Sequence, residues 1–278
     1  SVVAVCDLTM FDGASVIVTG AGQGIGAALA RALAGRGAQV LVSDLSPDLA
    51  TRIADEIGGV PHHGDLCDPS VIADMVTIAQ DAFGPIDMLF SNAGFALGEP
   101  DGPTSQPDAH WQRSWDLHVM AHLRASRLLV PDMVDRGSGV LVNIASAAGV
   151  LAQIGDAAYS ATKHAAVSVA QSLAIEHGVD GIQASVVCPL YVATPLLGYD
   201  ADATDRPAGV MTPEAVAEAT LEGVKEGQFI IFPHPEAHGF FQHRAADTDR
   251  WIAGMQRLRQ RVTEQADGSD PASIHRFI

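Results

Sequence analysis

Short apolar runs rich in valine and isoleucine alternate along the chain with longer segments of helical periodicity. The runs occupy residues 16–18, 40–42, 88–90, 140–144, 184–187 and 229–232. Between the second and third runs, Pro69 is followed by apolar residues at three- and four-residue spacing as far as Phe83, which predicts an amphipathic helix. Alternating strands and helices predict a parallel sheet, and strands that are apolar throughout indicate that helices cover both of its faces.

No internal repeat and no domain boundary interrupts this alternation. Residues 99–107 contain three prolines and predict a surface loop, and the acid-rich segment 199–207 predicts a mobile one. A hydrophobic content of 47% excludes disorder for the body of the chain. We therefore expect residues 1–278 to form a single doubly wound α/β domain with a seven-stranded parallel sheet and helices on both faces.

The charge balance excludes several classes of partner. The chain has 33 acidic residues against 16 lysines and arginines, a formal charge of −17, and only two lysines, Lys163 and Lys225. Nucleic acids are bound by clustered basic side chains, and anionic membrane surfaces repel acidic proteins, so we expect neither as a partner. Residues 236–278 differ, because they hold six acids and six arginines and are neutral.

Cysteine and histidine usage points to no disulfide framework and no metal site. Cys6, Cys67 and Cys188 are an odd number without metal-ligand spacing, which favours a reducing compartment, and we expect a cytoplasmic protein. The apolar run at residues 2–5 is too short for a signal peptide. His234, His238 and His243 surround a proline, and we interpret them as a loop entering the last helix, with no metal.

One glycine-rich turn predicts an anion site at the sheet edge. Residues 16–18 lead into Gly20, Gly24 and Gly26, and a good helical segment follows. Glycines allow a sharp turn and close approach of a ligand, while the first N–H groups of the helix favour a pyrophosphate. The next strand ends at Asp44, whose carboxylate can accept ribose hydroxyls and repel a 2′-phosphate. This pattern favours NAD over NADP; the alternative is a tight turn with nothing bound.

A second group of residues predicts acid–base chemistry. Tyr159 and Lys163 are four residues apart in a helical segment, so both side chains lie on one face. An ammonium near a tyrosine favours the phenolate. Ser146 follows the strand at residues 140–144, at the edge where ligands of parallel sheets bind. Taken alone, such a tyrosine–lysine pair is common in ordinary helices, and the glycine turn is what makes it a candidate site.

Together these features resemble the short-chain dehydrogenase/reductase family over about residues 11–195. The resemblance rests on motifs in a fixed order: Thr19 to Gly26, Asp44, Asp65-Leu66, Asn92-Ala93-Gly94, Ser146, Tyr159 with Lys163, and Pro189 followed by Thr194-Pro195. It implies a Rossmann-type domain that transfers a hydride between NAD and an alcohol or ketone. It also implies a homotetramer or homodimer.

The resemblance implies a role for each motif. Ser146 would orient the substrate oxygen, Tyr159 would be the catalytic acid/base, and Lys163 would hold the nicotinamide ribose and lower the tyrosine pKa. The adenine would lie against Asp65 and Leu66, Asn92 would brace the central strand, and Thr194 with the backbone of Val192 would hold the nicotinamide carboxamide. The implied cofactor-binding residues are Gly20, Gln23, Gly24, Ile25, Gly26, Asp44, Asp65, Leu66, Asn92, Ala93, Gly94, Tyr159, Lys163, Pro189, Val192 and Thr194.

Three positions depart from the family pattern. Ser91 replaces an asparagine, Leu190 replaces a glycine, and His118 stands where the family's fourth catalytic residue, an asparagine that holds a relay water, would be. Histidine donates and accepts hydrogen bonds and can carry a proton near neutral pH. His118 therefore either serves in the relay or is a buried core residue with the relay rerouted.

The substrate expectation comes from side chains near these motifs. Those expected to meet it are Phe95, Leu151, Gln153, Tyr191, Leu196 and Leu197, with a substrate loop at residues 196–212. They are mainly apolar and include no cation, which favours a neutral, hydrophobic, cyclic secondary alcohol or ketone. The rival hypothesis is an NAD-binding sensor or scaffold protein without turnover.

Two further features of the sequence have no predicted catalytic role. Residues 236–278 form a C-terminal helical extension in which Trp251, Met255 and Leu258 have helical spacing among arginines. We expect this helix to pack on the chain's own acidic body or on a neighbouring subunit. His62 and His63 are expected at a solvent-exposed edge.

Overall fold

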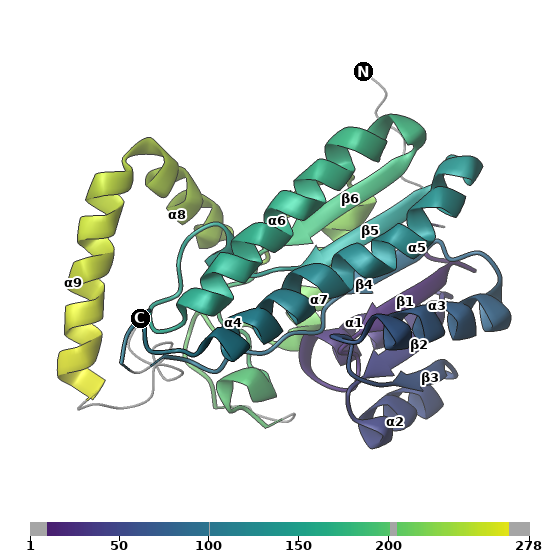
Figure 1. Cartoon of the computed structure of the whole chain (residues 1–278), viewed down its shortest axis with the longest axis horizontal. Helices are drawn as coiled ribbons and strands as arrows, with labels where there is room; N and C mark the ends of the chain where they lie inside the picture. The colour runs from purple at the N-terminus through teal and green to yellow at the C-terminus, as the bar shows by residue number, and fades with distance from the viewer. Residues whose placement is uncertain (1–9, 100, 201–204, 267–278) are drawn as a thin grey trace.

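The computed structural model describes residues 10–99, 101–200 and 205–266, and these form one doubly wound sheet with helices on both sides (Figure 1). The described strands make a seven-stranded parallel sheet in the order β3-β2-β1-β4-β5-β6-β7. They are β1 Ser15–Thr19, β2 Gln39–Asp44, β3 Val60–His63, β4 Met88–Ser91, β5 Gly139–Ile144, β6 Ile182–Val187 and β7 Ile230–Ile231. The predicted fold class is confirmed.

The helices divide between the two faces of the sheet. One face is covered by α1 (Gly24–Ala34), α2 (Pro47–Ile57) and α7 (Pro213–Lys225), and the other by α3 (Pro69–Phe83), α5 (Ala121–Arg136) and α6 (Ala157–His177). The predicted helix after Pro69 has the expected bounds. The remaining helical elements are α4 Asp108–Trp115, η1 Asp116–Met120, η2 Ala147–Gly149, η3 Gly178–Asp180, η4 Pro195–Leu197, α8 Pro235–Ala246 and α9 Thr248–Ala266.

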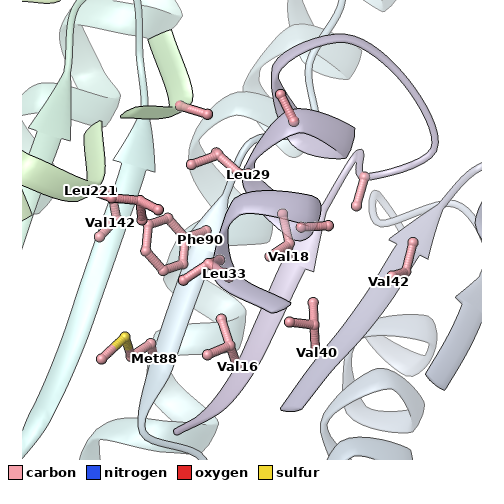
Figure 2. Close-up of a cluster of buried hydrophobic side chains, with 14 of the residues drawn as sticks. Val16, Val18, Leu29, Leu33, Val40, Val42, Met88, Phe90, Val142 and Leu221 are labelled. Carbon is pink, nitrogen blue, oxygen red and sulfur yellow. The ribbon is translucent and has the colours of Figure 1, made fainter. Parts of the chain in front are cut away.

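Alternation along each strand assigns its side chains to one face or the other. In β1, Val16 and Val18 pack against α1, whereas Ile17 lies in the cluster on the opposite face. Figure 2 shows the first cluster, with Leu29 and Leu33 of α1 over the strands. Because both faces are buried, the strands need apolar residues at every position, and this produced the continuous apolar runs in the sequence.

The carboxyl ends of the central strands meet at one edge of the sheet. β1 runs into the glycine turn, β4 into Asn92, β5 into Ser146 and β6 into Pro189. The strand order reverses between β1 and β4, and ligands of doubly wound sheets bind beside such a reversal. The motifs that are scattered through the sequence therefore share one edge.

One local expectation was wrong. His62 is only 4% exposed, because it faces α3 and its Nδ1 lies 3.0 Å from the Ser43 hydroxyl, whereas its neighbour His63 is exposed. Most of residues 101–107, before α4, are exposed, as expected of a surface loop, but Glu99 is buried and accepts the Ala157 N–H at 2.7 Å. Segment 199–207 was expected to be mobile. Residues 201–204 of this segment lie outside the described ranges.

The described helices include none that is both long enough and apolar enough to cross a membrane.

Candidate active site

The glycine turn leaves the start of α1 without a side-chain cap. Gly20 and Gly24 have positive φ angles of 59° and 54°, which a side chain would disfavour. The Gln23 side chain makes no capping hydrogen bond, whereas α2, α3, α6 and α7 are capped by Ser46, Asp68, Asp156 and Thr212. The first N–H groups of α1 are thus open to an anionic ligand.

Asp44 ties the glycine turn to the end of β2. Its Oδ2 accepts the Gly22 N–H at 2.9 Å and its Oδ1 accepts the Ser46 N–H at 3.0 Å. A Cβ on Gly22 would lie 2.8 Å from the same carboxylate, so only glycine allows this approach. Each carboxylate oxygen has a second lone pair, and Asp44 can therefore accept further hydroxyl groups.

Asn92 braces β1 against β4. Its side-chain amide donates to the carbonyls of Thr19 and Gly20 at 3.1 and 3.0 Å, while the Thr19 hydroxyl accepts the N–H groups of Asn92 and Ala93. These bonds join the glycine turn to the segment after β4. Ser91, where the family pattern has asparagine, instead pairs its hydroxyl with Nδ1 of His122 at 2.9 Å.

Ser146, Tyr159 and Lys163 come together at the start of α6. Ser146 begins η2 and hydrogen-bonds the Tyr159 hydroxyl, and Lys163 Nζ lies 5.5 Å from the centre of the Tyr159 ring. Lys163 is 4% exposed and donates to the Ile144 carbonyl at 3.0 Å, which fixes its position beside β5. The predicted trio therefore shares one site.

Desolvation controls the acid–base properties of this site. It raises the pKa of Tyr159 to about 12, against the opposing effect of the Ser146 hydrogen bond, and lowers the pKa of Lys163 to about 8. Burial is the largest cause of the raised tyrosine pKa in the chain by itself, and the expectation that Lys163 lowers this pKa stays a prediction. Tyr159 is thus a protonated acid at neutral pH.

His118 is enclosed by hydrogen-bond partners within the chain. Its Nε2 accepts the Phe95 N–H at 3.2 Å, so the neutral ring carries its proton on Nδ1 and donates to the Thr162 hydroxyl at 2.8 Å. Burial first, and the nearby Lys163 second, hold the pKa of His118 well below 6.5. The residue lies in the π-helical turn η1, and both ring nitrogens are occupied.

A cleft of about 1160 Å³ opens beside the catalytic trio. Its lining includes Ser146, Tyr159 and Lys163, together with several residues predicted to bind the cofactor or the substrate. The predicted residues found there are Ile25, Asn92, Gly94, Leu151, Gln153, Pro189, Tyr191, Val192, Thr194, Leu196 and Leu197. Residues that follow β1, β4, β5 and β6 thus meet around one space.

Other predicted residues lie elsewhere. Phe95 does not line the cleft: its ring packs 5.1 Å from His118 and 6.1 Å from His110, so the expectation that it meets substrate is not supported. Leu66 and Ala93 line a separate cavity of about 20 Å³ beside Lys163. Asp65 pairs with Arg113 at 2.9 Å. Gly20, Gly24, Gly26 and Asp44 are not among the residues that line the cleft.

Comparison with known proteins matches residues 14–204 to the profile of the short chain dehydrogenase family. The chain belongs to the short-chain dehydrogenase family. Its members are oxidoreductases, and curated relatives act on CH–OH groups. A D-beta-hydroxybutyrate dehydrogenase of Rhizobium meliloti is 33% identical over 78% of this chain and 86% of its own. The cis-4-hydroxycyclohexanecarboxylate dehydrogenase of Sinomonas cyclohexanicum is 35% identical over 73% and 86%.

Solved structures of the family have the same fold. A short-chain dehydrogenase/reductase from Burkholderia phymatum in complex with NAD matches with a TM-score of 0.78, 25% identity, and coverage of 86% of this chain and 95% of that one. A 3-ketoacyl-(acyl-carrier-protein) reductase from Brucella melitensis complexed with NADH matches at 0.72 and 27%, over 80% and 98%.

Eight cleft residues lie beyond the segment that the family profile matches, and five of them come from the two C-terminal helices. These five are Glu236, Phe240, Trp251, Met255 and Leu258, all from α8 and α9. Helical spacing had indicated an apolar face on α9, but spacing does not identify what a face packs against. The expected helical extension at residues 236–278 corresponds, within the described residues, to α8 and α9, and residues 267–278 lie outside those residues.

The histidines after β7 have structural roles. His234, 2% exposed, accepts the Leu190 N–H at 3.1 Å through Nδ1 and donates from Nε2 to the Tyr191 carbonyl. It thereby holds the segment where leucine replaces the family's glycine. His238 and His243 lie in α8 rather than in a loop. The described residues contain no cluster of side chains suited to a metal ion.

Buried neutral histidines should make stability sensitive to acid. Burial lowers the pKa of His122 from 6.5 to about 4, so below pH 6.5 only the unfolded chain takes up this proton. The free energy of unfolding is therefore highest above pH 6.5 and should fall by about 2 kcal/mol at this residue between pH 7 and 5. Urea denaturation at both pH values measures it. His122→Gln, which cannot titrate, should remove that part of the loss, and an unchanged pH dependence would contradict the assignment.

Proposed function

We propose that the protein is an NAD-dependent oxidoreductase that transfers a hydride between the nicotinamide and a neutral, hydrophobic, cyclic secondary alcohol or ketone. The observation that carries this proposal is the cleft itself. Ser146, Tyr159 and Lys163 line it together with Val192 and Thr194, the residues expected to hold the nicotinamide. The acid–base groups therefore lie in the same cleft as residues expected to bind the dinucleotide.

The residues present fit a dinucleotide. The uncapped start of α1 supplies N–H groups for a pyrophosphate, and Asp44 retains acceptor capacity for ribose hydroxyls. The Asp44 carboxylate would repel a 2′-phosphate, which favours NAD over NADP. Two structural relatives were solved with NAD and NADH, in agreement with this choice. When bound, the nicotinamide supplies or accepts the hydride.

The chain's own residues transfer the proton and orient the substrate oxygen. In the reducing direction, Tyr159 donates its hydroxyl proton to the oxygen while the Ser146 hydroxyl steadies that oxygen. The raised pKa of Tyr159 keeps it protonated at neutral pH and suits it to this role. Lys163, held by the Ile144 carbonyl, keeps a cationic group beside the tyrosine ring and stabilises the phenolate that remains.

His118 acts in this proposal as a positioning residue rather than a proton carrier. One ring nitrogen holds the N–H of Phe95 in the segment after Gly94, and the other holds Thr162 between Tyr159 and Lys163 on α6. A neutral ring with both nitrogens occupied has no free site for a relayed proton. Of the two readings left open by the sequence, this geometry supports the buried structural residue.

The lining of the cleft supports a neutral apolar substrate. Among the described residues, its charged members are Asp156, Lys163 and Glu236. The Asp156 carboxylate already accepts the N–H groups of Leu97, Gly98 and Tyr159. A carboxylate substrate would find no cation apart from Lys163, whereas the apolar side chains Leu97, Leu196 and Phe240 are exposed in the cleft and offer contact to a hydrocarbon ring.

A matched pair of substrates tests the proposal. Reduced-cofactor absorbance is followed with NAD or NADP and with 4-methylcyclohexanol or cis-4-hydroxycyclohexanecarboxylate, which differ at position 4 by a methyl or a carboxylate. We expect turnover with NAD and the neutral alcohol, and at least about tenfold lower kcat/KM for the acid, an effect of about 1.4 kcal/mol. Preference for the acid would contradict the substrate class. NAD binding without turnover of any alcohol would support the sensor alternative.

We also propose that the chain assembles as a homodimer or homotetramer in the cytoplasm. Trp115 of α4, Leu128 of α5 and Ile175 of α6 are large apolar side chains left exposed on neighbouring helices, which supports contact with a second copy. Cys67 and Cys188 are free thiols, which suits a reducing compartment.

A further inference from the structure

The two C-terminal helices, α8 and α9, lie outside the layers of the sheet and its covering helices, at one end of the molecule (Figure 1). We refer to this pair as the C-terminal cap. It packs as a helical pair and lies beyond residues 14–204, the segment shared with the family profile. The family profile therefore assigns no role to this cap.

We propose that the C-terminal cap is the outer wall of the substrate cleft, that Arg244 holds it in place, and that Trp251, Met255 and Leu258 select bulky apolar substrates. The proposal rests on the proposed function, because it concerns the same cleft. It adds positioning and specificity residues that the motifs of the family do not include.

The inner surface of the cap faces the catalytic residues. Trp251, Met255 and Leu258 follow one another at spacings of four and three, so they lie on one face of α9, and all three line the cleft that contains Tyr159. Phe240 of α8 lines it as well, although 49% of the side chain is exposed. An apolar face left open to a catalytic cleft gains free energy when a hydrocarbon covers it.

Arg244 connects the cap to the segment after the catalytic serine. Its Nη1 donates to the Val150 carbonyl at 2.6 Å, and its guanidinium lies 5.5 Å from the centre of the Trp251 ring. Val150 follows η2, the short helix that Ser146 begins. No carboxylate within the described residues pairs with Arg244, so its charge is directed to the carbonyl and the indole.

The base of the cap is fixed independently. Phe232, after β7, packs against His238 and Phe241 of α8 at ring distances of 5.6 and 6.0 Å. Trp251 and Phe241 also pack on the buried cluster that includes Val150 and Leu151. Loss of Arg244 would thus loosen the outer end of the cap while α8 keeps its attachment, and the wall rather than the whole fold would change.

Steady-state kinetics with a small and a large alcohol test this wall. Cyclohexanol is compared with 4-cyclohexylcyclohexanol, whose second ring reaches farther from the reacting carbon. Arg244→Met should raise KM for the large alcohol by about tenfold, the effect of losing one charge-assisted hydrogen bond, with kcat for cyclohexanol within about threefold of wild type. The control is Arg250→Met, which removes the same charge from an exposed position on α9.

Two more variants distinguish loss of the Arg244 contacts from a general folding defect. Leu258→Ala truncates the wall and leaves the Arg244 contacts in place, and it should also raise KM for the large alcohol. The double variant Arg244→Met/Trp251→Ala should lose less than the sum of the two single variants, because either change alone removes the contact between these side chains. Equal losses for both alcohols, or an unchanged KM in Arg244→Met and Leu258→Ala, would overturn the proposal.

The affinity for the neutral dye Nile red, measured by fluorescence without cofactor, tests the apolar wall of the cleft independently of turnover. We expect wild type and Arg250→Met to bind it equally, and Arg244→Met and Leu258→Ala to bind about tenfold more weakly. If wild type oxidises no alcohol but these differences persist, the proposed function fails and the wall remains supported. If all four proteins bind the dye alike, the wall is wrong.

Discussion

Replacing Tyr159 by phenylalanine should lower kcat by about 10³-fold in both directions, because the change removes the acid/base and little else. The Tyr159 hydroxyl is hydrogen-bonded to Ser146 in a cleft where the charged side chains of Asp156 and Lys163 are engaged by backbone groups. The measurement is single-turnover and steady-state kinetics with NAD and a cyclic alcohol. NAD affinity and the urea midpoint should stay close to wild type, which excludes a folding effect.

The pH dependence of the wild-type enzyme provides a second readout for Tyr159. Oxidation of the alcohol needs the phenolate, so its rate should rise by about tenfold per pH unit below a pKa raised by burial. Reduction of the ketone needs the neutral hydroxyl and should stay level through neutral pH. A residual kcat within tenfold of wild type in Tyr159→Phe, or an oxidation rate that does not rise with pH, would remove Tyr159 from this role.

The catalytic trio could be predicted from the sequence because its geometry is local. Helical spacing places Tyr159 and Lys163 on one face of α6. Ser146 lies next to them because it follows β5 at the carboxyl edge of the sheet, where α6 begins. The glycine turn and Asp44 are equally local, since they follow adjacent strands. Local patterns of this kind are sufficient to predict both the fold and the position of the site.

Features that depend on distant packing could not be predicted. His62 was expected at an exposed edge because the short strand β3, which ends in two histidines, has no alternation of apolar and polar positions, and only the position of α3 buries it. Phe95 follows a motif that faces the cleft, yet its ring packs on His118, a residue 23 positions later. The tyrosine pKa depends on how much solvent is excluded, which no motif encodes.

Gly26→Ala should lose NAD binding and stability together. Alanine is the better helix former by about 1 kcal/mol, so local propensity alone predicts a more stable α1. A Cβ at this position would overlap the Gly20 carbonyl and the Asn92 amide, however, and both are fixed by the hydrogen bond between them. Because neither neighbour can move without breaking that bond, we expect a loss of about 1–3 kcal/mol in the free energy of unfolding.

The same displacement would move the first N–H groups of α1, so the dissociation constant for NAD should rise by at least about tenfold. Urea denaturation and a fluorescence titration with NADH measure the two effects. Gly178→Ala is the matched control, since its Cβ would meet no atom within 4 Å and its φ of −61° suits alanine. If Gly26→Ala were as stable as this control and still bound NADH, close packing of the turn on Asn92 would not be what shapes the cofactor site.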